Sequence, residues 1–358
     1  MKDVRRILVT GNMGYIGPTV VRRLRERWPE AVVAGLDNGY FAHCLTGGDF
    51  LPETGCDMQY FADVRHVGEE VMQGVDAVIH LAAISNDPMG NAFEQVTREV
   101  NYEASVRLAN MAKSAGVRAF VFASSCSVYG YAEGEARSEQ SELNPLTAYA
   151  RSKIDTEQSI QGLADDHFVI TSLRFPTACG MSERLRLDLV LNDFVASAIA
   201  TGTIKILSDG TPWRPLIDIK DMASAMEWAV AREPANGGAF LAVNVGRNEW
   251  NFQIRDLALA VQAQIPGVAI EINPDAPPDK RSYRVDFSLY QRLAADHLPQ
   301  VPIEQSIGEL KAGLEQMGFN NGNFRNSQYM RLRVLADLRA RGRLDEALNW
   351  RLENRLAM

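Results

Sequence analysis

Three glycines between an apolar run and an amphipathic segment constrain this chain more than any other feature. The segment reads ILVTGNMGYIGPTVVRRL, with its glycines spaced three residues apart. Glycine permits a tight turn and lets the backbone approach a diphosphate, which then rests on the N-terminus of the following helix. A strand before the turn and a helix after it, over about 15–27, therefore predict a nucleotide-binding α/β unit. The residues assigned to cofactor binding in this turn are Gly11, Met13, Gly14, Tyr15, Ile16 and Gly17.

A carboxylate follows the glycine turn at an informative distance. Asp37 ends the next apolar run, 20 residues after Gly17. A carboxylate at this place accepts hydrogen bonds from a ribose 2′-hydroxyl and repels a 2′-phosphate. The sequence therefore favours NAD over NADP as the cofactor. Pro18 departs from the usual pattern, but proline is tolerated near a helix start.

Short apolar runs alternate with helical patterns through the first 175 residues. The runs lack polar alternation, which is typical of strands buried on both faces. Repeated β-α-β order predicts a doubly wound parallel sheet with right-handed crossovers. The predicted strands are 5–10, 31–36, 58–61, 77–80, 119–123 and 169–173. The predicted helices are about 15–27, 65–73, 92–114 and 147–163, followed later by helices near 185–200 and from about 220, and by strands near 203–207 and 216–219. The proline-rich region 266–282 is expected to be a loop.

Charge and composition exclude several classes of function. The net charge is −8, which argues against a surface that binds nucleic acid. The four cysteines form no CxxC pair, so neither a metal site nor a disulfide framework is expected. The sequence has no run of 18 apolar residues and no signal-peptide pattern, so no membrane association is expected. These features predict a cytoplasmic protein.

A second group of residues carries proton-transfer chemistry. Tyr149 and Lys153 are four residues apart on a predicted helix and therefore share one helix face. A lysine ammonium beside a phenol favours the phenolate and lowers the tyrosine pKa. Such a tyrosine can exchange a proton with a hydroxyl group of a sugar. Ser125, just after the strand 119–123, would hold that hydroxyl by a hydrogen bond.

Together these motifs resemble the extended short-chain dehydrogenase/reductase family, in particular its nucleotide-sugar epimerases and dehydratases. The resemblance covers about 4–318 and rests on TGNMGYIG, HLAA, SSCSVYG, YARSK and WRPLIDIKDMA, which occur in family order. It implies a Rossmann-type α/β fold with a smaller C-terminal substrate-binding lobe. The expected division is 1–175 for the NAD-binding domain, with 210–250 returning to it, and 176–318 for the lobe.

The resemblance also assigns roles around the cofactor. Tyr149 would be the acid/base, Lys153 would position it and the nicotinamide ribose, and Ser125 would be the catalytic hydroxyl. Cys126 is a further candidate acid/base, with packing as the alternative. For Asn101 a structural role is an open alternative. The cofactor-binding residues implied outside the glycine turn and Asp37 are Asp63, Val64, Leu81, Ala82, Ala83, Asn101, Ser124, Tyr149 and Lys153.

On the substrate side, the resemblance implies a nucleotide-diphosphate sugar. Arg214 and Arg281 would bind the diphosphate, because guanidinium groups match phosphate oxygens. Surface salt bridges are the alternative for both. The remaining residues assigned to the substrate are Ser125, Ser127, Thr177, Arg186 and Asn192.

The reaction is inferred by elimination. The family's 4,6-dehydratases carry Asp and Glu at the positions of Cys126 and Ser127, and this chain has neither carboxylate. An NAD-dependent epimerase acting at C4 through a transient 4-keto intermediate is therefore expected. The alternatives are a 4-ketoreductase, an atypical dehydratase that uses Cys126, and a non-catalytic nucleotide-binding protein.

Assembly and the C-terminal region complete the expectations. The resemblance implies a homodimer built on a four-helix bundle, and Val100, Ala104 and Leu108 form a stripe that could serve it or pack on the sheet. Residues 319–358 form a basic extension, with eight arginines and four acids from 325 onward. Two helical stretches are predicted here, because four leucines recur every fourth residue from Leu344. The extension is expected to dock on the protein's own surface or on its dimer mate; a lid or a partner-binding role is the alternative.

Overall fold

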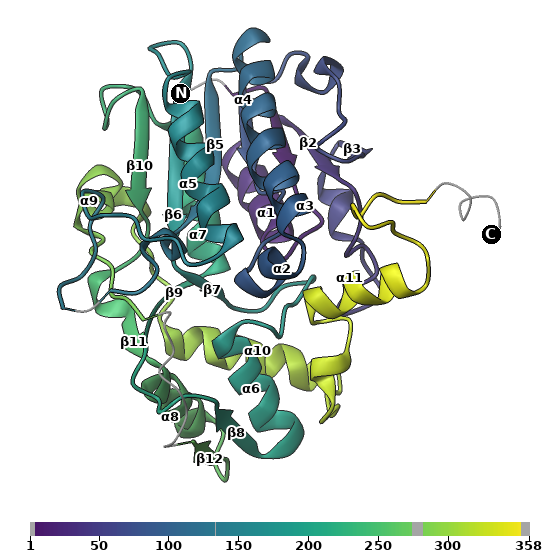
Figure 1. Cartoon of the computed structure of the whole chain (residues 1–358), viewed down its shortest axis with the longest axis vertical. Helices are drawn as coiled ribbons and strands as arrows, with labels where there is room; N and C mark the ends of the chain where they lie inside the picture. The colour runs from purple at the N-terminus through teal and green to yellow at the C-terminus, as the bar shows by residue number, and fades with distance from the viewer. Residues whose placement is uncertain (1–3, 133, 274–281, 352–358) are drawn as a thin grey trace.

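A seven-stranded parallel sheet forms the centre of the protein (Figure 1). The computed structural model describes residues 4–132, 134–273 and 282–351. The spatial order β10-β6-β5-β4-β1-β2-β3 reverses direction at β1 and β4, so the sheet is doubly wound, as predicted. Its strands are β1 (Arg6–Thr10), β2 (Val32–Asp37), β3 (Met58–Phe61), β4 (Ala77–His80), β5 (Ala119–Ser125), β6 (Val169–Phe175) and β10 (Phe240–Asn244).

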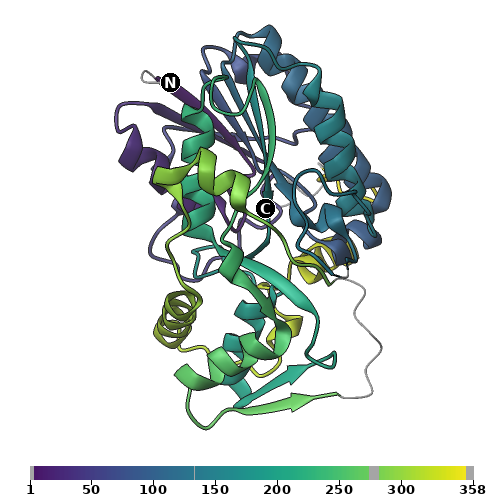
Figure 2. The same ribbon diagram turned by 90° about the vertical axis from the view of Figure 1, so that its left-hand side faces the viewer.

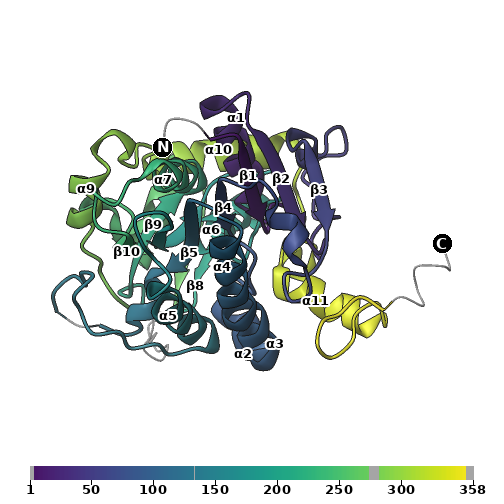
Figure 3. The same ribbon diagram turned by 90° about the horizontal axis from the view of Figure 1, so that it is seen from above.

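Helices cover both faces of this sheet. The helices α1 (Gly17–Arg27) and α7 (Ile219–Ala231) pack on one face, and α4 (Ala104–Ser114) and α5 (Ala148–Gln161) lie on the other (Figure 3). Alternate residues of β1 enter two different cores, with Ile7 on the α1 side and Leu8 on the α4 side. This burial on both faces explains why the strands read as unbroken apolar runs.

A smaller lobe lies beyond the carboxyl ends of the central strands (Figure 2). A three-stranded sheet in the order β11-β9-β7 and a two-stranded sheet in the order β12-β8 belong to it. The strands are β7 (Thr177–Cys179), β8 (Thr203–Ile206), β9 (Trp213–Asp218), β11 (Asn251–Gln253) and β12 (Ala269–Ile272). Its helices are α6 (Val190–Thr201), α8 (Ile254–Gln264) and α10 (Ile303–Gln316), whereas α9 (Ser288–Leu293) lies beside β10 of the central sheet. Because ligands of open α/β sheets bind at this edge, the lobe stands over the expected site.

Three predicted segments differ from the structure. The helix expected at 92–114 begins at 94 and continues without a break through α3 (Glu94–Thr97), a π-helical turn (Arg98–Glu103) and α4. Phe93 leaves helical geometry and separates it from the preceding α2 (Asp87–Ala92). Residues 65–73 form only a short 3₁₀ helix, Glu69–Met72, between Gly68 and Gly74. The segment 266–282 was expected to be a loop, but β12 pairs with β8 within it.

Among the described residues, the C-terminal extension contains one α-helix, α11 (Arg331–Ala340), shown in yellow in Figure 1, and one 3₁₀ turn, Phe324–Asn326. The second predicted helix is wrong for 344–351, where Leu344 and Trp350 form an antiparallel bridge. Gly342 adopts a φ of 66° and ends the helical path. Leu344 and Leu348 then enter the core on the α4 side. Two more residues of the leucine stripe, Leu352 and Leu356, lie outside the described residues.

The stripe considered for a dimer interface is buried within the chain itself. Val100 is 7% exposed, Ala104 is 2% exposed and Leu108 is fully buried, all in the core on that face of the sheet. Of the two interpretations, packing on the sheet is the one that the structure supports. The stripe therefore does not provide a surface for a second copy.

Candidate active site

The glycine turn after β1 leaves one side open for a diphosphate. Gly11 has a φ of 74°, and a Cβ there would lie 2.5 Å from the backbone nitrogen of Ala82. A Cβ on Gly17 would lie 1.9 Å from the carbonyl oxygen of Asn12. On Gly14, in contrast, a Cβ would meet only the Gly11 carbonyl oxygen, at 3.1 Å. Gly11 and Gly17 are thus required by packing, whereas Gly14 borders free space at the N-terminus of α1, which fits a cofactor diphosphate.

Asp37 lies at the end of β2, beside this turn. Its carboxylate accepts hydrogen bonds from the backbone N–H groups of Met13, at 3.1 Å, and Gly39, at 2.8 Å. Burial raises the pKa of Asp37, and these two bonds oppose the increase. The carboxylate is therefore fixed in the place where a ribose hydroxyl is expected. The Met13 N–H is used by this contact and is not available to a diphosphate.

A hydrogen-bonded chain supports the loop after β4. Thr10 contacts Nδ1 of His80 at 2.6 Å, and Nε2 of His80 contacts Ser105 at 2.7 Å. Burial lowers the pKa of His80 to about 3, so the ring is neutral. Asn101 accepts a bond from the Ile84 N–H at 2.8 Å and donates to the Ile84 carbonyl at 3.0 Å. Asn101 thus orders the loop that begins with Leu81, Ala82 and Ala83, and its amide does not face the site.

The structure brings Ser125, Tyr149 and Lys153 together at the carboxyl edge. Thr147 begins α5 by accepting a hydrogen bond from the Ala150 N–H at 3.1 Å, which directs Tyr149 toward the end of β5. A side-chain hydrogen bond links Tyr149 to Ser125. The Lys153 ammonium lies 5.5 Å from the centre of the Tyr149 ring.

In the protein without ligands, the pKa shifts of Tyr149 and Lys153 differ from those expected from the sequence. Burial raises the pKa of Tyr149 to about 12, and the bond with Ser125 only opposes this. Burial lowers the pKa of Lys153 to about 7, while the nearby Glu157 carboxylate raises it. Lys153 also donates to the Ala123 carbonyl at 2.7 Å. The lowered tyrosine pKa expected from the sequence is therefore wrong for the protein without ligands, because burial disfavours the charged phenolate.

The side chains of the residues next to Ser125 have different surroundings. The Ser124 hydroxyl donates to Glu157 at 2.5 Å, behind the site. The fully buried Cys126 thiol points to the Arg174 carbonyl, at 3.1 Å, and burial raises its pKa. This is the setting of a packing residue and does not support the acid/base role considered for Cys126. The Ser127 hydroxyl, in contrast, is buried without a hydrogen-bond partner in the described part of the chain.

The lobe contributes a buried polar network rather than free side chains. Arg186 binds both oxygens of Asp188 at 2.9 Å and donates to Ser85 at 3.1 Å. The Asn192 amide donates to the Tyr15 hydroxyl at 3.0 Å and to the Arg186 carbonyl at 2.8 Å, and it accepts from the Gly180 N–H. The assignment of Asn192 to substrate is therefore not supported. Asn192 instead joins the lobe to the Tyr15 side chain.

The remaining substrate assignments lie along the lobe strands. Thr177, on β7, is half-buried and pairs with Leu216 of β9. Arg214 is on β9, and its guanidinium donates to the Trp213 carbonyl at 3.0 Å. Arg281 lies outside the described residues.

Two functional candidates were not found from the sequence. Tyr283 is buried, and its pKa is raised by burial, with Arg214 and Tyr149 close enough to influence it. Asp87 begins α2 and accepts a hydrogen bond from Thr147 at 2.7 Å, and its charge acts on Tyr149. The Asp-Pro pair after a central strand was an available signal for Asp87, since proline marks a helix start at the carboxyl edge.

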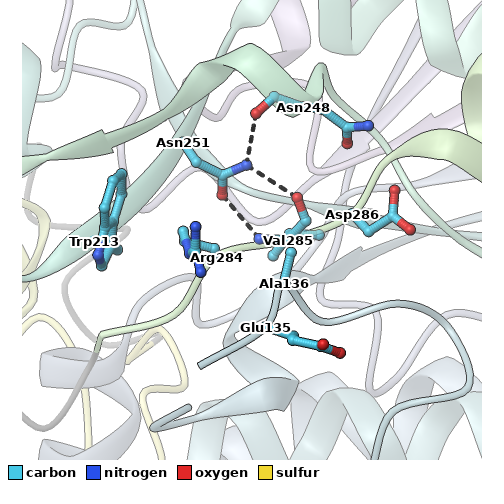
Figure 4. A pocket seen from close by; sticks show the side chains of 8 residues that line it. All are labelled: Glu135, Ala136, Trp213, Asn248, Asn251, Arg284, Val285 and Asp286. Carbon is cyan, nitrogen blue, oxygen red and sulfur yellow. Dashed lines mark hydrogen bonds between the residues drawn. The ribbon is translucent and has the colours of Figure 1, made fainter. Parts of the chain in front are cut away.

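An open pocket of about 490 Å³ lies between the loop after β5 and the β9–β11 pair (Figure 4). Arg284 stacks 5.3 Å from the centre of the Trp213 ring and also donates to the Gly134 carbonyl. Asn251 bonds to the Val285 N–H at 2.8 Å and to the Val285 carbonyl at 3.0 Å. The pocket thus borders residues 284–286, which directly follow Tyr283. Its lining consists of Glu135, Ala136, Trp213, Asn248, Asn251, Arg284, Val285 and Asp286.

Comparison with known proteins places this site in a family. The model of the NAD dependent epimerase/dehydratase family matches residues 7–246. The chain belongs to this family. The family is NAD dependent, which agrees with the cofactor predicted from the glycine turn and Asp37. No helix in the described ranges is long and apolar enough to cross a membrane, and the same ranges contain no cluster of metal-ligating side chains.

Individual relatives carry several sugar-nucleotide chemistries. A UDP-glucose 4-epimerase of Streptomyces lividans is 28% identical over 281 residues, which are 72% of this chain and 80% of the relative. The structure of a UDP-glucose-4-epimerase from Stenotrophomonas maltophila, with bound NAD and formylated UDP-arabinopyranose, matches with a TM-score of 0.76 at 23% identity. It covers 88% of this chain and 99% of its own. The NAD-dependent NDP-hexosamine 5,6-dehydratase TunA matches with a TM-score of 0.74 at 24% identity, over 87% of this chain and 98% of its own. The fold is thus shared by epimerases and a dehydratase.

Proposed function

We propose that this protein is an NAD-dependent epimerase of a nucleotide-diphosphate sugar and that it inverts C4 through a transient 4-keto intermediate. The convergence of Ser125, Tyr149 and Lys153 beside the glycine turn carries this proposal. When bound, NAD supplies a hydride acceptor that later returns the hydride, so no net oxidation occurs. The lack of carboxylates at 126 and 127 supports epimerisation over 4,6-dehydration.

Each catalytic side chain then has one task. Tyr149 removes the proton of the C4 hydroxyl and gives it back after the sugar has turned. Ser125 orients that hydroxyl, through the same oxygen that bonds to Tyr149. Lys153, held by the Ala123 carbonyl, positions Tyr149 and binds the nicotinamide ribose. Asp37 binds the adenosine ribose, and Asp63 with Val64 borders the adenine.

The substrate would lie between the catalytic residues and the lobe. The buried Ser127 hydroxyl has no partner among the described residues, which supports a hydrogen bond to the sugar. Thr177 and Tyr283 would also border the sugar, and Arg214 and Arg281 would bind the diphosphate. The Streptomyces lividans relative is a UDP-glucose 4-epimerase, so a UDP-hexose is the first substrate to test.

The proposal includes a cytoplasmic location and a homodimer. In the bundle arrangement expected from the sequence, the outer faces of α4 and α5 would meet their copies. These faces are polar in the structure, and the exposed residues of the two helices are Asn110, Ser114, Arg151, Asp155, Gln158, Ser159 and Gln161. Pairing would therefore depend on polar contacts, and light scattering at several protein concentrations measures it.

The purified protein should be incubated with a panel of nucleotide sugars without added cofactor and followed by proton NMR. Equilibration between axial and equatorial C4 hydroxyls would establish the epimerase. A 4-keto-6-deoxy or 5,6-unsaturated product would identify a dehydratase and overturn the proposal. Turnover of a keto sugar only with added NADH would identify a 4-ketoreductase.

A further inference from the structure

The C-terminal extension crosses one end of the cofactor site. We call residues 331–350 the C-terminal strap; it begins with α11 and continues through the Leu344–Trp350 bridge. Figures 1 and 3 show it beside the β2–β3 edge of the sheet. Asp37 ends β2 and Asp63 lies in the loop after β3, and these are the residues assigned to adenosine. The strap therefore lies near the adenosine half of NAD.

The strap binds the β2 loop immediately after Asp37. Nε1 of Trp350 donates to the Asn38 carbonyl at 2.7 Å. The Trp350 ring lies 5.9 Å from the centre of the Tyr40 ring. The Tyr40 hydroxyl, which is buried, donates to the Leu348 carbonyl. Trp350 of the strap thus binds the backbone of the β2 loop, and Tyr40 of the β2 loop binds the backbone of the strap.

The strap binds the β3 loop through a single arginine. Arg65 donates to the Ala347 carbonyl at 2.8 Å and to the Asn349 side chain at 3.0 Å. The same guanidinium pairs with Asp63 at 2.8 Å and with Glu99 at 3.2 Å. The side chain of Arg65 is only 6% exposed. Arg65 therefore connects the strap directly to the carboxylate expected beside the adenine.

The conformation of the strap is imposed by these contacts and by burial. Leu348 has a φ of 56°, a left-handed value that is unfavourable for leucine. Its side chain is nevertheless fully buried in the core on the α4 side, where four more strap residues also lie. These are Val334, Leu335, Leu338 and Leu344. A strained residue persists only where its surroundings determine it, and such residues concentrate at ligand sites.

We propose that the C-terminal strap is part of the cofactor site and retains NAD by locking the two loops that hold adenosine. NAD would then leave only after the strap separates from Asn38, Tyr40 and Arg65. An epimerase re-forms its own NAD in each cycle and gains nothing from cofactor exchange. The inference rests on the proposed adenosine roles of Asp37 and Asp63, but not on the identity of the sugar.

The dissociation rate of bound NAD tests the strap directly and requires no substrate. Trp350→Ala removes the bond to Asn38 and the ring beside Tyr40, and we expect NAD to dissociate at least tenfold faster. Release is followed by trapping free nucleotide after rapid dilution. Arg333→Ala is the matched control, because Arg333 is an exposed residue of α11 that pairs with Asp337 at 3.2 Å within the same helix. It should leave the rate unchanged.

Hydrogen exchange of the wild-type protein provides a test without any variant. If the strap stabilises bound NAD, then NAD must stabilise the docked strap to the same extent. Exchange of the backbone amides of 341–351 should therefore slow when NAD is added to nucleotide-free protein. Unchanged exchange there, or an unchanged NAD dissociation rate in a folded Trp350→Ala variant, would overturn the proposal. Loss of sugar turnover with normal strap behaviour would instead contradict the proposed reaction.

Discussion

Glu157 binds Arg174 through both carboxylate oxygens, one helical turn beyond Lys153. Nη2 of Arg174 lies 2.6 Å from one oxygen, and Nε lies 3.1 Å from the other. Both side chains are buried, and Ser124 donates a further hydrogen bond to Glu157. The pair connects α5 to β6 behind the catalytic residues. The Glu157 carboxylate also raises the pKa of Lys153 against the effect of burial.

Removing Arg174 should destabilise the protein strongly. Arg174→Met leaves the buried Glu157 carboxylate without its charged partner, and breaking such a pair costs about 3–5 kcal/mol. Urea denaturation measures the loss. The exposed pair of Arg333 and Asp337 provides the control, since Arg333→Met should cost less than about 1 kcal/mol. Equal losses in the two variants would show that the buried pair contributes no more to the free energy of unfolding than the exposed pair.

Tyr149→Phe should remove turnover and leave the cofactor in place. Loss of a general acid/base typically lowers kcat by about 10²–10⁴-fold. The phenyl ring still fills the space beside Lys153, so the melting temperature and the amount of bound NAD should change little. Tyr102→Phe is the control, because Tyr102 lies on the outer side of the π-helical turn and contacts Ser159 at 3.3 Å. Residual activity within threefold of wild type would exclude Tyr149 as the acid/base.

The features that the sequence predicts most directly are encoded in short segments. The glycine turn, the β-α-β alternation and the Tyr149–Lys153 spacing each depend on residues that are close in sequence. Periodicity also identified Val100 and Leu108 as one buried face, although it could not show that the sheet covers them. Which surface covers this face depends on tertiary packing, which the structure shows.

The errors arose where distant residues decide the outcome. The Asn192 side-chain amide donates a hydrogen bond to the hydroxyl of Tyr15, which lies 177 positions away. Trp350 bonds to Asn38 across 312 positions. Leu344 and Leu348 have helical spacing, but burial in the core and the turn at Gly342 give them an irregular path. Docking of the extension on the protein's own surface was expected, and strap residues do enter its core. Local patterns do not contain the distant partners, so neither the contacts of the strap nor the role of Asn192 could be predicted.

Gly14→Ala should separate cofactor binding from folding. The new Cβ would approach only the Gly11 carbonyl, at 3.1 Å, so the turn can form with a small adjustment. The methyl group would point into the space proposed for the diphosphate, and we expect NAD affinity to fall at least tenfold with little change in melting temperature. Gly17→Ala should instead destabilise the fold, because its Cβ would lie 1.9 Å from the Asn12 carbonyl oxygen. Calorimetric titration with NAD and thermal melts distinguish the two variants. Normal NAD affinity in Gly14→Ala would place the diphosphate elsewhere.

In nucleotide-free protein, the titration of Lys153 should make the free energy of unfolding depend on pH. Burial lowers its pKa to about 7 in the folded chain, whereas an unfolded lysine titrates near about 10.4. Between these values the unfolded chain binds a proton that the folded chain does not, so the free energy of unfolding rises with pH.

The difference in unfolding free energy between wild type and Lys153→Met isolates this contribution. From pH 7 to 9.5 it should shift in favour of the wild type by more than about 1 kcal/mol, since one pKa unit corresponds to about 1.4 kcal/mol. Urea denaturation at four pH values measures it. Lys205→Met is the control for the loss of a solvent-exposed lysine, because the side chain of Lys205 is 64% exposed. A difference that stays constant with pH would mean that Lys153 is already charged in the folded protein, with its ammonium stabilised by the Ala123 carbonyl and Glu157.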